Sequence, residues 1–364
     1  MKKITKQCRL YPNREMKEAL DKYFGCCRFV WNSLLEETYH YAGIINQPYL
    51  NSLLTELKTK HDFLKDCSSV ALQQVTFSLA SAWSAFFNNV AQKPRFKSRK
   101  MGHNSFKLVG DCVNGVGTKY VHFPKIGECK YKNSWGNLSK ISSYVVSKKR
   151  NGKYYISFLV EVELKPKTQS GMVGIDVGLS YFATCADNQG NHWKINNPKF
   201  LLKRQRAYKR ASRRLSRKVL GSANRNKSRN RLAALVGKTV NQRNDYLHKV
   251  STELVSKYQH IVIEDLNIRG LLKNNRLAKH ISDTGWGEFF RQLHYKALMY
   301  NTPIHIIKAP RWYPSTQICA NCNSKREVRL HLNERSWTCN YCGASHDRDI
   351  NAAQNLLKQV LSSR

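Results

Sequence analysis

The sequence predicts an α/β domain in the second half of the chain, preceded by an α+β half that combines a helical module with a small β-barrel-like module. Three observations support this prediction. Strand-like and helical stretches alternate after Met172. Four cysteines near the C-terminus share a spacing typical of a metal-binding insert. Residues 16–100 carry apolar side chains at helical spacing, and a chain of 364 residues with 41% hydrophobic content can bury two or three cores.

The charge balance indicates the kind of partner. The chain has 62 Lys and Arg against 24 Asp and Glu, a formal net charge of +38. A surface this electropositive favours a polyanion such as nucleic acid. No apolar run reaches the roughly 18 residues that a membrane span requires, and the start of the chain lacks the apolar segment of a signal peptide. We therefore expect a soluble, intracellular protein without a membrane partner.

The first helical module is predicted over residues 16–100. Apolar residues recur at helical spacing from Leu20 to Leu34, and Asn13 is placed to cap the first helix. The aromatic residues of the second helical stretch also lie near helical spacing, which predicts that they belong to the core rather than to a base-stacking surface. They are Phe77, Trp83, Phe86 and Phe87.

The β module is predicted to take its first strand from residues 1–15 and the rest from residues 101–168. Alternating stretches flank the pair Asn151-Gly152, which predicts a hairpin with a type I′ turn. Residues 165–171, with the sequence "KPKTQSG", predict a linker to the next domain.

The second half begins with three strand-like runs joined by tight turns. A helical stretch, a strand, a helix, a strand and a final helix follow, so that residues 169–310 and 346–364 belong to one domain. This is the element order of an RNase H-like α/β sheet. In that fold the first strand, the strand after the helical stretch and the final helix meet at one edge of the sheet, and here each of the three carries an acid.

Two of the acids lie in strands. Asp176 lies inside the alternating strand "VGIDVGL", and Glu264 closes the apolar strand "IVIE". A carboxylate in such a place is costly unless it is paired or bound to a metal. Singly, each could be a partly exposed acid or the partner of an arginine, but their order together with a third acid favours a shared site.

The third acid is Asp347 or Asp349, and helical spacing decides between them. Asp349 shares an apolar face, suited to packing on a sheet, with Ala352, Ala353, Leu356 and Val360. Asp347 shares the opposite face with Ile350, Asn351, Gln354 and Lys358. Asp347 also lies where a side-chain oxygen would cap the helix, so we assign it to capping and Asp349 to metal binding.

Asp176, Glu264 and Asp349 are therefore predicted to be catalytic and to hold two Mg²⁺ ions about 3.5–4 Å apart. Hard oxygen ligands suit Mg²⁺. One ion would activate a water molecule for in-line attack on a phosphodiester, and the other would stabilise the leaving oxygen.

The four cysteines form the pattern C-x2-C-x16-C-x2-C within a predicted zinc module at residues 311–345. They are Cys319, Cys322, Cys339 and Cys342, and the spacing predicts a zinc ribbon that binds one tetrahedral Zn²⁺. His346 is either a neighbour of this zinc or a simple loop residue, and we favour the loop. Arg348 is a phosphate contact or a partner of Asp347. The other seven cysteines are expected to be reduced thiols.

Residues 203–238 hold 14 Lys and Arg and no acid. So many like charges favour nucleic-acid backbone contacts over a merely solvated face. The candidate contacts are Arg204, Arg206, Arg210, Arg213, Arg214 and Arg217, with Arg95 in the basic run "KPRFKSRK".

These motifs resemble, in order and along nearly the whole chain, the TnpB (OrfB) family of insertion sequences, which is related to type V CRISPR effectors and Fanzor proteins. The resemblance rests on "RLYPNREMKEAL", "CCRFVWNSLL", "KPRFKSRK", "GIDVGLSYFAT", "IVIEDLNIRGL", "GWGEFFRQLHYKA", "YPSTQICANC" and "CNYCGASHDRDINAAQNLL".

The resemblance implies an RNA-guided DNA endonuclease with a RuvC-like nuclease domain. It implies a guide RNA from the transposon end, target double-stranded DNA beside a short target-adjacent motif, and one protein per RNA. It also implies a prokaryotic protein of the cytoplasm that associates with the nucleoid. By position, the family's acidic triad falls on Asp176, Glu264 and Asp349, and residues 203–238 correspond to its bridge helix. The helical module and the β (wedge) module would hold the guide. A catalytically silent RNA-guided DNA-binding repressor and an accessory transposase are the alternatives.

Overall fold

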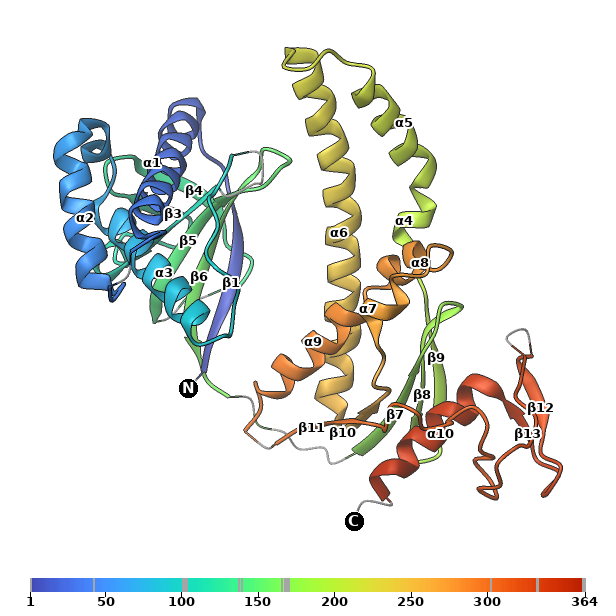
Figure 1. The fold of residues 1–364 in the computed structure, drawn as a ribbon. Coiled ribbons are helices and arrows are strands. Elements are labelled where there is room, and N and C mark those ends of the chain that lie inside the picture. Colours follow the sequence, from blue (N-terminus) through green and yellow to red (C-terminus); the bar gives the residue numbers. More distant parts are fainter. Residues whose placement is uncertain are drawn as a thin grey trace. The chain divides into compact units, whose positions relative to one another are not determined.

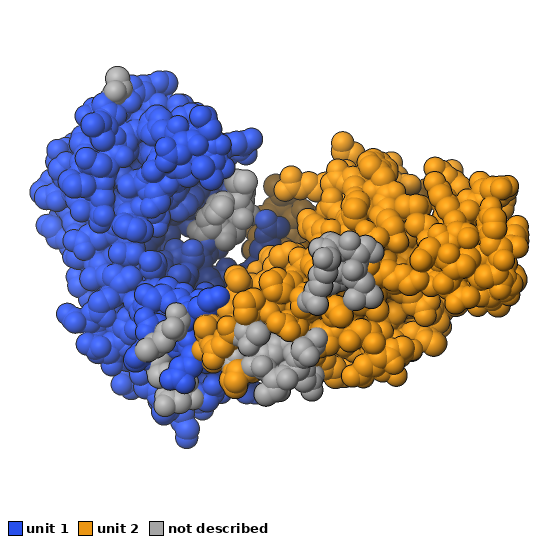
Figure 2. All heavy atoms as spheres, turned by 90° about the horizontal axis from the view of Figure 1, so that it is seen from below, with its two compact units in different colours: residues 1–163 blue, residues 164–364 orange. Residues whose placement is uncertain are grey.

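The computed structural model describes residues 2–41, 43–99, 104–136, 138, 140–164, 166, 171–301, 303–331 and 334–361. The chain divides into two compact units, unit 1 at residues 1–163 and unit 2 at residues 164–364 (Figure 2). Most of the predicted linker at 165–171 lies outside the described residues. None of the helices in the described part of the chain has the length and apolar character needed to cross a membrane.

Unit 1 joins helices to an antiparallel sheet of six strands in the order β2-β5-β6-β1-β4-β3 (Figure 1). Its strands are β1 (Lys2–Leu10), β2 (Ser105–Val109), β3 (Tyr120–Phe123), β4 (Gly127–Lys132), β5 (Ile141–Lys148) and β6 (Tyr154–Val162). Its α-helices are α1 (Arg14–Thr38), α2 (Gln47–Lys60) and α3 (Ser69–Phe87), with short 3-10 turns at Asp62–Asp66 and Gly110–Val113.

The helices and the sheet of unit 1 share one hydrophobic core. Asn13 caps α1 as predicted, because its side chain accepts a hydrogen bond of 2.8 Å from the backbone N–H of Met16. The apolar face of α1 then packs on the sheet, where the rings of Phe24 and Phe106 lie 5.6 Å apart. The helical residues and the strands on both sides of them in sequence therefore form a single packed body.

The prediction for the aromatic residues of α3 is partly wrong. Trp83 is buried and Phe86 packs against the core, but Phe77 and Phe87 are 48% and 58% exposed. The buried face of α3 runs through Leu72, Leu79 and Trp83, and the other two rings fall outside it.

The predicted hairpin forms between β5 and β6, but the turn is not type I′. That turn needs positive φ at both central residues, and here Gly152 (φ +74°) has it whereas Asn151 does not. Lys149 donates to the carbonyl of Lys153, and Gly152 donates to the carbonyl of Lys149, each at 2.9 Å. The connection is a three-residue loop with glycine in the left-handed region, which an Asn-Gly pair also suits.

Unit 2 is built on a five-stranded sheet in the order β11-β10-β7-β8-β9. Its strands are β7 (Gly171–Val177), β8 (Tyr181–Asp187), β9 (His192–Asn196), β10 (Tyr258–Ile263) and β11 (His305–Lys308), with a separate pair β12 (Ser336–Thr338) and β13 (Ser345–Asp347). Its helices are α4 (Phe200–Lys203), α5 (Gln205–Ser216), α6 (Ala223–Lys257), α7 (Ile268–Leu271), α8 (Ala278–Thr284), α9 (Trp286–Ala297) and α10 (Arg348–Leu361).

The predicted order of strands and helices in unit 2 is confirmed. Strands β7, β8 and β9 form an antiparallel meander, and β10 and β11 add parallel to β7. One expectation is wrong, because β7 lies in the middle of the sheet and not at its edge. The carboxyl ends of β7 and β10 thus meet at the centre of the sheet.

Helices cover both faces of this sheet. Val173 and Ile175 of β7 pack with α6 and α9 on one face. On the other face α10 lies across the strands, where Leu356 packs with Val262 (Figure 1). Since side chains alternate along a strand, Gly174 and Asp176 belong to the face that α10 covers.

Candidate metal sites and basic surface

The first two acids lie at matching positions of neighbouring strands. Strands β7 and β10 are parallel and pair Ile175 with Ile263. The residue after each of these is an acid, Asp176 in β7 and Glu264 directly after β10. Parallel pairing therefore brings these two carboxylates side by side at the carboxyl ends of the strands.

The third acid arrives on α10. Asp347 caps this helix as predicted, because its Oδ1 accepts hydrogen bonds from the backbone N–H groups of Asp349 (3.0 Å) and Ile350 (3.1 Å). Asp349 then lies in the first helical turn. We refer to Asp176, Glu264 and Asp349 as the acid cluster.

Gly174 sets how closely α10 approaches the sheet. A Cβ at this position would lie 2.2 Å from the carbonyl oxygen of Ala353 and 2.6 Å from the backbone nitrogen of Leu357. Any larger residue would collide with the helix backbone, so glycine is required for this packing. The same contact brings the first turn of α10, with Asp349, down to Asp176.

The surroundings of Asp176 and Glu264 disfavour their charged forms. Burial raises the pKa of Asp176 well above its ordinary value, and the negative charges of Glu264 and Asp349 raise it further. Burial also raises the pKa of Glu264, although hydrogen bonds from Ser315 and Asp176 oppose the shift. The Oγ of Ser315 donates to Glu264 Oε1 at 3.3 Å.

These residues fit a hard divalent cation. Three oxygen-bearing acids that repel one another in a partly buried place gain most from a cation between them. The carboxylates of the acid cluster lie farther apart than the ligands of a closed metal site. Among the described residues, the ligand atoms that all lie within 4.8 Å of one another belong to the four cysteines. On the outer side, Arg335 lies 3.6 Å from Asp349.

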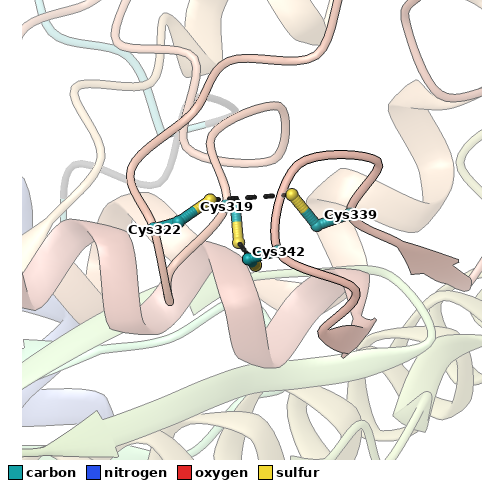
Figure 3. Close-up of side chains that lie close together, drawn as sticks. All are labelled: Cys319, Cys322, Cys339 and Cys342. Atoms are coloured by element: carbon teal, nitrogen blue, oxygen red, sulfur yellow. Dashed lines mark hydrogen bonds between the residues drawn. The ribbon is translucent and has the colours of Figure 1, made fainter.

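The four predicted cysteines come together. The Sγ atoms of Cys319 and Cys342 lie 3.7 Å apart, as do those of Cys322 and Cys339 (Figure 3). Tetrahedral Zn²⁺ with Zn–S bonds of about 2.3 Å separates its sulfur ligands by about 3.8 Å. The four-cysteine cluster therefore has the dimensions of a structural zinc site.

Two similar turns present the thiols. In each, the residue after the second cysteine has positive φ, Asn323 at +62° and Gly343 at +70°. In each, that residue donates its backbone N–H to the carbonyl of the first cysteine, Cys319 or Cys339, at 2.9 Å. The C-x2-C spacing folds in this way because a left-handed residue turns the chain and leaves both thiols on one side.

The thiols differ in how readily they ionise. Hydrogen bonds from Ser324 lower the pKa of Cys322 to about 6, whereas burial raises the pKa of Cys319 to about 11. A bound cation would keep all four as thiolates.

The prediction for His346 is wrong. It lies in strand β13 and not in a loop, and its Nε2 is 3.0 Å from the Sγ of Cys319. Its ring also packs on Trp337, with centroids 4.7 Å apart. His346 is thus a direct neighbour of the four-cysteine cluster, and the pattern C-x2-C-x16-C-x2-C gave no sign of it because the contact depends on the β12–β13 pairing.

A second buried face of α10 holds the cysteine-bearing segment. Asn351, predicted on the face away from the core, is fully buried, and so is Asn355. Both donate to the carbonyl of Ile318, at 2.7 and 2.6 Å, and Asn351 accepts from the backbone N–H of Ala320 at 2.8 Å. Helix α10 therefore joins the acid cluster to the four-cysteine cluster.

Several contacts near the acid cluster were not predicted. Ser315 holds Glu264, and Lys194 on β9 forms an ion pair of 2.6 Å with Asp347. Asp347 thus has Lys194 as its partner, and Arg348 donates to the carbonyl of His331 at 2.9 Å. These contacts link segments far apart in the chain, so no local pattern could reveal them.

The basic segment 203–238 is not one helix, as the bridge-helix expectation had it. It forms α5 and the first half of α6, with a turn between them at Gly221 (φ +83°). Side chains of α5 and of the two residues that follow Ser216 line a surface pocket of about 660 Å³, and none of them is acidic. We call them the α5 row: Arg206, Lys209, Arg210, Arg213, Arg214, Arg217 and Lys218. Such a row of cations suits the phosphates of a nucleic-acid backbone.

The other two candidate arginines lie outside this row. Arg204 lies between α4 and α5, directly after the last residue of α4. Arg95 belongs to unit 1, where its guanidinium donates to Gln92 at 2.6 Å and its carbonyl accepts from Trp31 at 3.0 Å.

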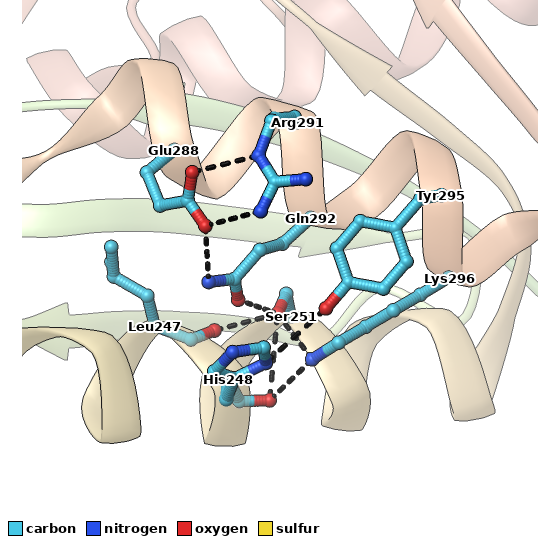
Figure 4. Close-up of polar contacts among 8 residues, drawn as sticks. All are labelled: Leu247, His248, Ser251, Glu288, Arg291, Gln292, Tyr295 and Lys296. Carbon is cyan, nitrogen blue, oxygen red and sulfur yellow. Dashed lines mark hydrogen bonds and ion pairs between the residues drawn. The ribbon is translucent and has the colours of Figure 1, made fainter. Parts of the chain in front are cut away.

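A buried polar network fixes α9 against α6 (Figure 4). The Lys296 ammonium donates to the carbonyl of His248 and to the hydroxyl of Ser251, each at 2.7 Å. Ser251 in turn donates to Gln292 at 2.8 Å. Burial lowers the pKa of Lys296 to about 8. These contacts hold together the two helices that cover the face of the sheet opposite the acid cluster.

Family models match three parts of the chain. Residues 155–275 match the OrfB_IS605 model, described as "Probable transposase", and residues 286–356 match "Cas12f1-like, TNB domain". Residues 1–42 match the "Helix-turn-helix domain" of OrfB_IS605 proteins, and here that stretch forms β1 and α1.

Two bacterial relatives align with nearly the whole chain. A Streptomyces pristinaespiralis protein named "Putative RNA-guided DNA endonuclease" is 36% identical over 98% of this chain and 89% of its own length. The Escherichia coli K12 protein "Putative RNA-guided DNA endonuclease InsQ" is 32% identical over 96% of this chain and 90% of its own length.

A solved structure of a Cas12f1–sgRNA–target DNA complex covers 98% of this chain and 99% of its own, with 16% identity and a TM-score of 0.39. The extent and identity of the two bacterial matches, with the OrfB models along the chain, establish the family. The chain belongs to the OrfB (TnpB) family.

Proposed function

We propose that this protein is an RNA-guided DNA endonuclease of a transposon, with an RNase H-like, RuvC-like sheet in unit 2 as its nuclease domain. The observation that carries the proposal is the approach of three acids from β7, β10 and α10. Parallel pairing sets Asp176 beside Glu264, and the close contact of α10 with Gly174 brings Asp349 toward Asp176. The names of the two full-length relatives support the guided activity.

Asp176, Glu264 and Asp349 would hold the Mg²⁺ ions. When bound, the ions supply an activated water and charge stabilisation for phosphodiester cleavage. Around them, Ser315 orients Glu264 through its hydrogen bond, and Asp347 fixes the first turn of α10 and so the backbone of Asp349. Arg335, beside Asp349, is placed to bind a phosphate oxygen of the strand being cut.

The four cysteines would hold Zn²⁺ as a structural ion. Their sulfur spacing supports zinc, and the buried contacts of Asn351 and Asn355 would transmit the order of this module to α10. The arginines of α5 would bind the backbone of the guide RNA or of its duplex with the target, without reading sequence.

Unit 1 would complete the assembly. We propose that residues 16–100 and the strands on both sides of them, residues 1–15 and 101–168, grip the guide and read a short target-adjacent motif. Residues 169–310 and 346–364 would form the nuclease domain, and residues 311–345 the zinc module.

The test begins with the full chain purified from cells that carry its transposon end. Sequencing of the copurifying RNA should identify a guide, and DNA matched to this guide should be cut only with Mg²⁺ present. Asp176→Ala should abolish cutting while RNA and DNA binding persist. Glu253→Gln, at an exposed acid of α6 that pairs with Lys257, is the matched control and should cut normally. Cutting by Asp176→Ala would refute the site.

A further inference from the structure

Trp312 is unusual among the seven tryptophans of this chain. Its side chain is 89% exposed, whereas the next most exposed, Trp135, is 51% exposed and four others are buried. Leaving a large aromatic surface in water forgoes the free energy of burying it. A ring in this position is therefore available to a ligand.

The loop that carries Trp312 is anchored on both sides. The Arg311 guanidinium forms an ion pair of 3.0 Å with Asp265, and the Tyr313 hydroxyl donates to the carbonyl of Asn355 at 3.4 Å. The backbone N–H of Tyr313 also donates to the carbonyl of Pro310 at 2.9 Å. The indole is thus presented from a fixed backbone, and a ligand would bind it without the cost of ordering a loop.

The same anchors place Trp312 next to the acid cluster. Asp265, the partner of Arg311, directly follows Glu264 in sequence, and Ser315 hydrogen-bonds Glu264 itself. Trp312 lies between these two anchor points, and three residues span at most about 11 Å. A nucleotide whose phosphate reached the acid cluster would have its base, or that of a neighbour, within reach of the indole.

The surrounding charge suits a nucleic acid. Lys308 and Arg311 both approach Asp265, so two cations face one acid beside Trp312. Sites for single-stranded nucleic acid combine a positive surface with exposed aromatic rings on which unpaired bases stack. The bases of a continuous duplex could not stack on Trp312, because they already stack on one another.

We propose that Trp312 stacks on an unpaired base of the DNA strand that lies in the acid cluster. The identity of that strand as the one to be cut rests on the proposed function, whereas the stacking contact rests on the exposure, the anchoring and the charge of this loop.

The test is a double-mutant cycle on the full chain, in which the Trp312 side chain and one DNA base are removed singly and together and the binding affinity is measured each time. The probe is a labelled single strand of about 12 nucleotides, intact or with one abasic site moved along it. Binding is followed by fluorescence anisotropy without added Mg²⁺ and without a chelator, so that the zinc module stays loaded. Trp312→Ala should weaken binding of the intact strand by about 5- to 150-fold, the range expected for one stacked base. Trp312→Phe should retain most of the affinity.

An abasic site at one position should weaken binding to the unmodified protein by a similar factor, and should not weaken binding to Trp312→Ala further. Tyr341→Ala, at another exposed aromatic of unit 2, is the control and should bind like the unmodified protein. Equal affinities of Trp312→Ala and the unmodified protein, or equal sensitivity of both to abasic sites, would overturn the stacking contact.

A cleavage assay separates this inference from the proposed function. Protein that cuts guide-matched DNA but shows no coupling between Trp312 and any base would refute the stacking contact alone. Protein that shows the coupling but never cuts would refute the nuclease and support the contact.

Discussion

The two candidate metal sites of unit 2 are built in opposite ways. The four-cysteine cluster is local, formed by two short turns between Cys319 and Gly343, and its sulfur atoms already have the spacing of a tetrahedral ion. The acid cluster joins residues that are far apart in the sequence, Asp176, Glu264 and Asp349. The sheet and α10 hold these residues near one another. In the first site an ion would order the chain, and in the second the ordered chain would position the ions.

The largest effect is expected where the acid cluster loses a ligand. Asp349→Asn should lower the rate of DNA cutting by more than about 100-fold, beyond the 10- to 100-fold typical of residues that only support a ligand. Asp347→Asn should cut more slowly by a smaller factor, because it weakens a cap and not a ligand. Single-turnover cleavage assays measure both, and equal losses would remove the distinction between the two aspartates.

The four-cysteine cluster should respond through folding. Cys339→Ser should lose bound zinc and disorder the segment that Asn351 and Asn355 hold, because structural zinc contributes about 10–16 kcal/mol to such modules. Elemental analysis and limited proteolysis near residue 330 measure the loss. Cys112→Ser, at a partly buried thiol of unit 1, should keep its zinc. A folded, metal-free preparation of the unmodified protein would contradict the assignment.

The acid cluster should show the reverse response, a gain of stability when a charge is removed. The folded chain raises the pKa of Asp176 above its ordinary value of 3.8, mainly through burial. Ionisation therefore opposes folding, and the stability of protein without Mg²⁺ in the acid cluster falls as the pH rises from below 3.8 through the raised pKa.

Asp176→Asn should accordingly raise the Tm of Mg²⁺-free, zinc-loaded protein at pH 7, by about 2–4 °C for each kcal/mol gained. The gain should vanish at acidic pH, where Asp176 is protonated, and should shrink when Mg²⁺ is added. A lower Tm for the variant at pH 7 would mean that the ionised Asp176 carboxylate stabilises the fold, which contradicts the destabilising burial and repulsion inferred for the acid cluster.

The smallest effect is expected on the basic surface. Arg213→Ala should lower affinity for RNA modestly and reduce the slope of log affinity against log salt by about one. An Arg225→Ala control is unsuitable, since Arg225 holds the turn through the carbonyls of Leu215 and Lys218. Lys249→Ala, at an exposed lysine outside the α5 row, should leave the slope unchanged.

The features that could be predicted from the sequence are those set by residues close together in the chain, and the features that were missed depend on contacts between distant segments. Strand alternation, helical spacing and the C-x2-C pairs are local, and they predicted the element order, the cap at Asp347, the acids and the cysteines. The burial of Asn351 and Asn355 was not predicted, because polar residues signal a solvent face unless the partner carbonyls are known. The contacts of His346 and Lys194 depend on strand pairing, and the break between α5 and α6 falls where a single Gly221 gave too weak a signal.

Gly174 has a consequence for variation in this protein. It contributes no atom to either metal site, yet the absence of its side chain fixes the depth at which α10 rests on the sheet. Replacing it by alanine would lift the helix and separate Asp349 from Asp176 while every acid and every cysteine stayed in place. One added methyl group could thus pull the acid cluster apart, and a search for substituted acids would overlook it.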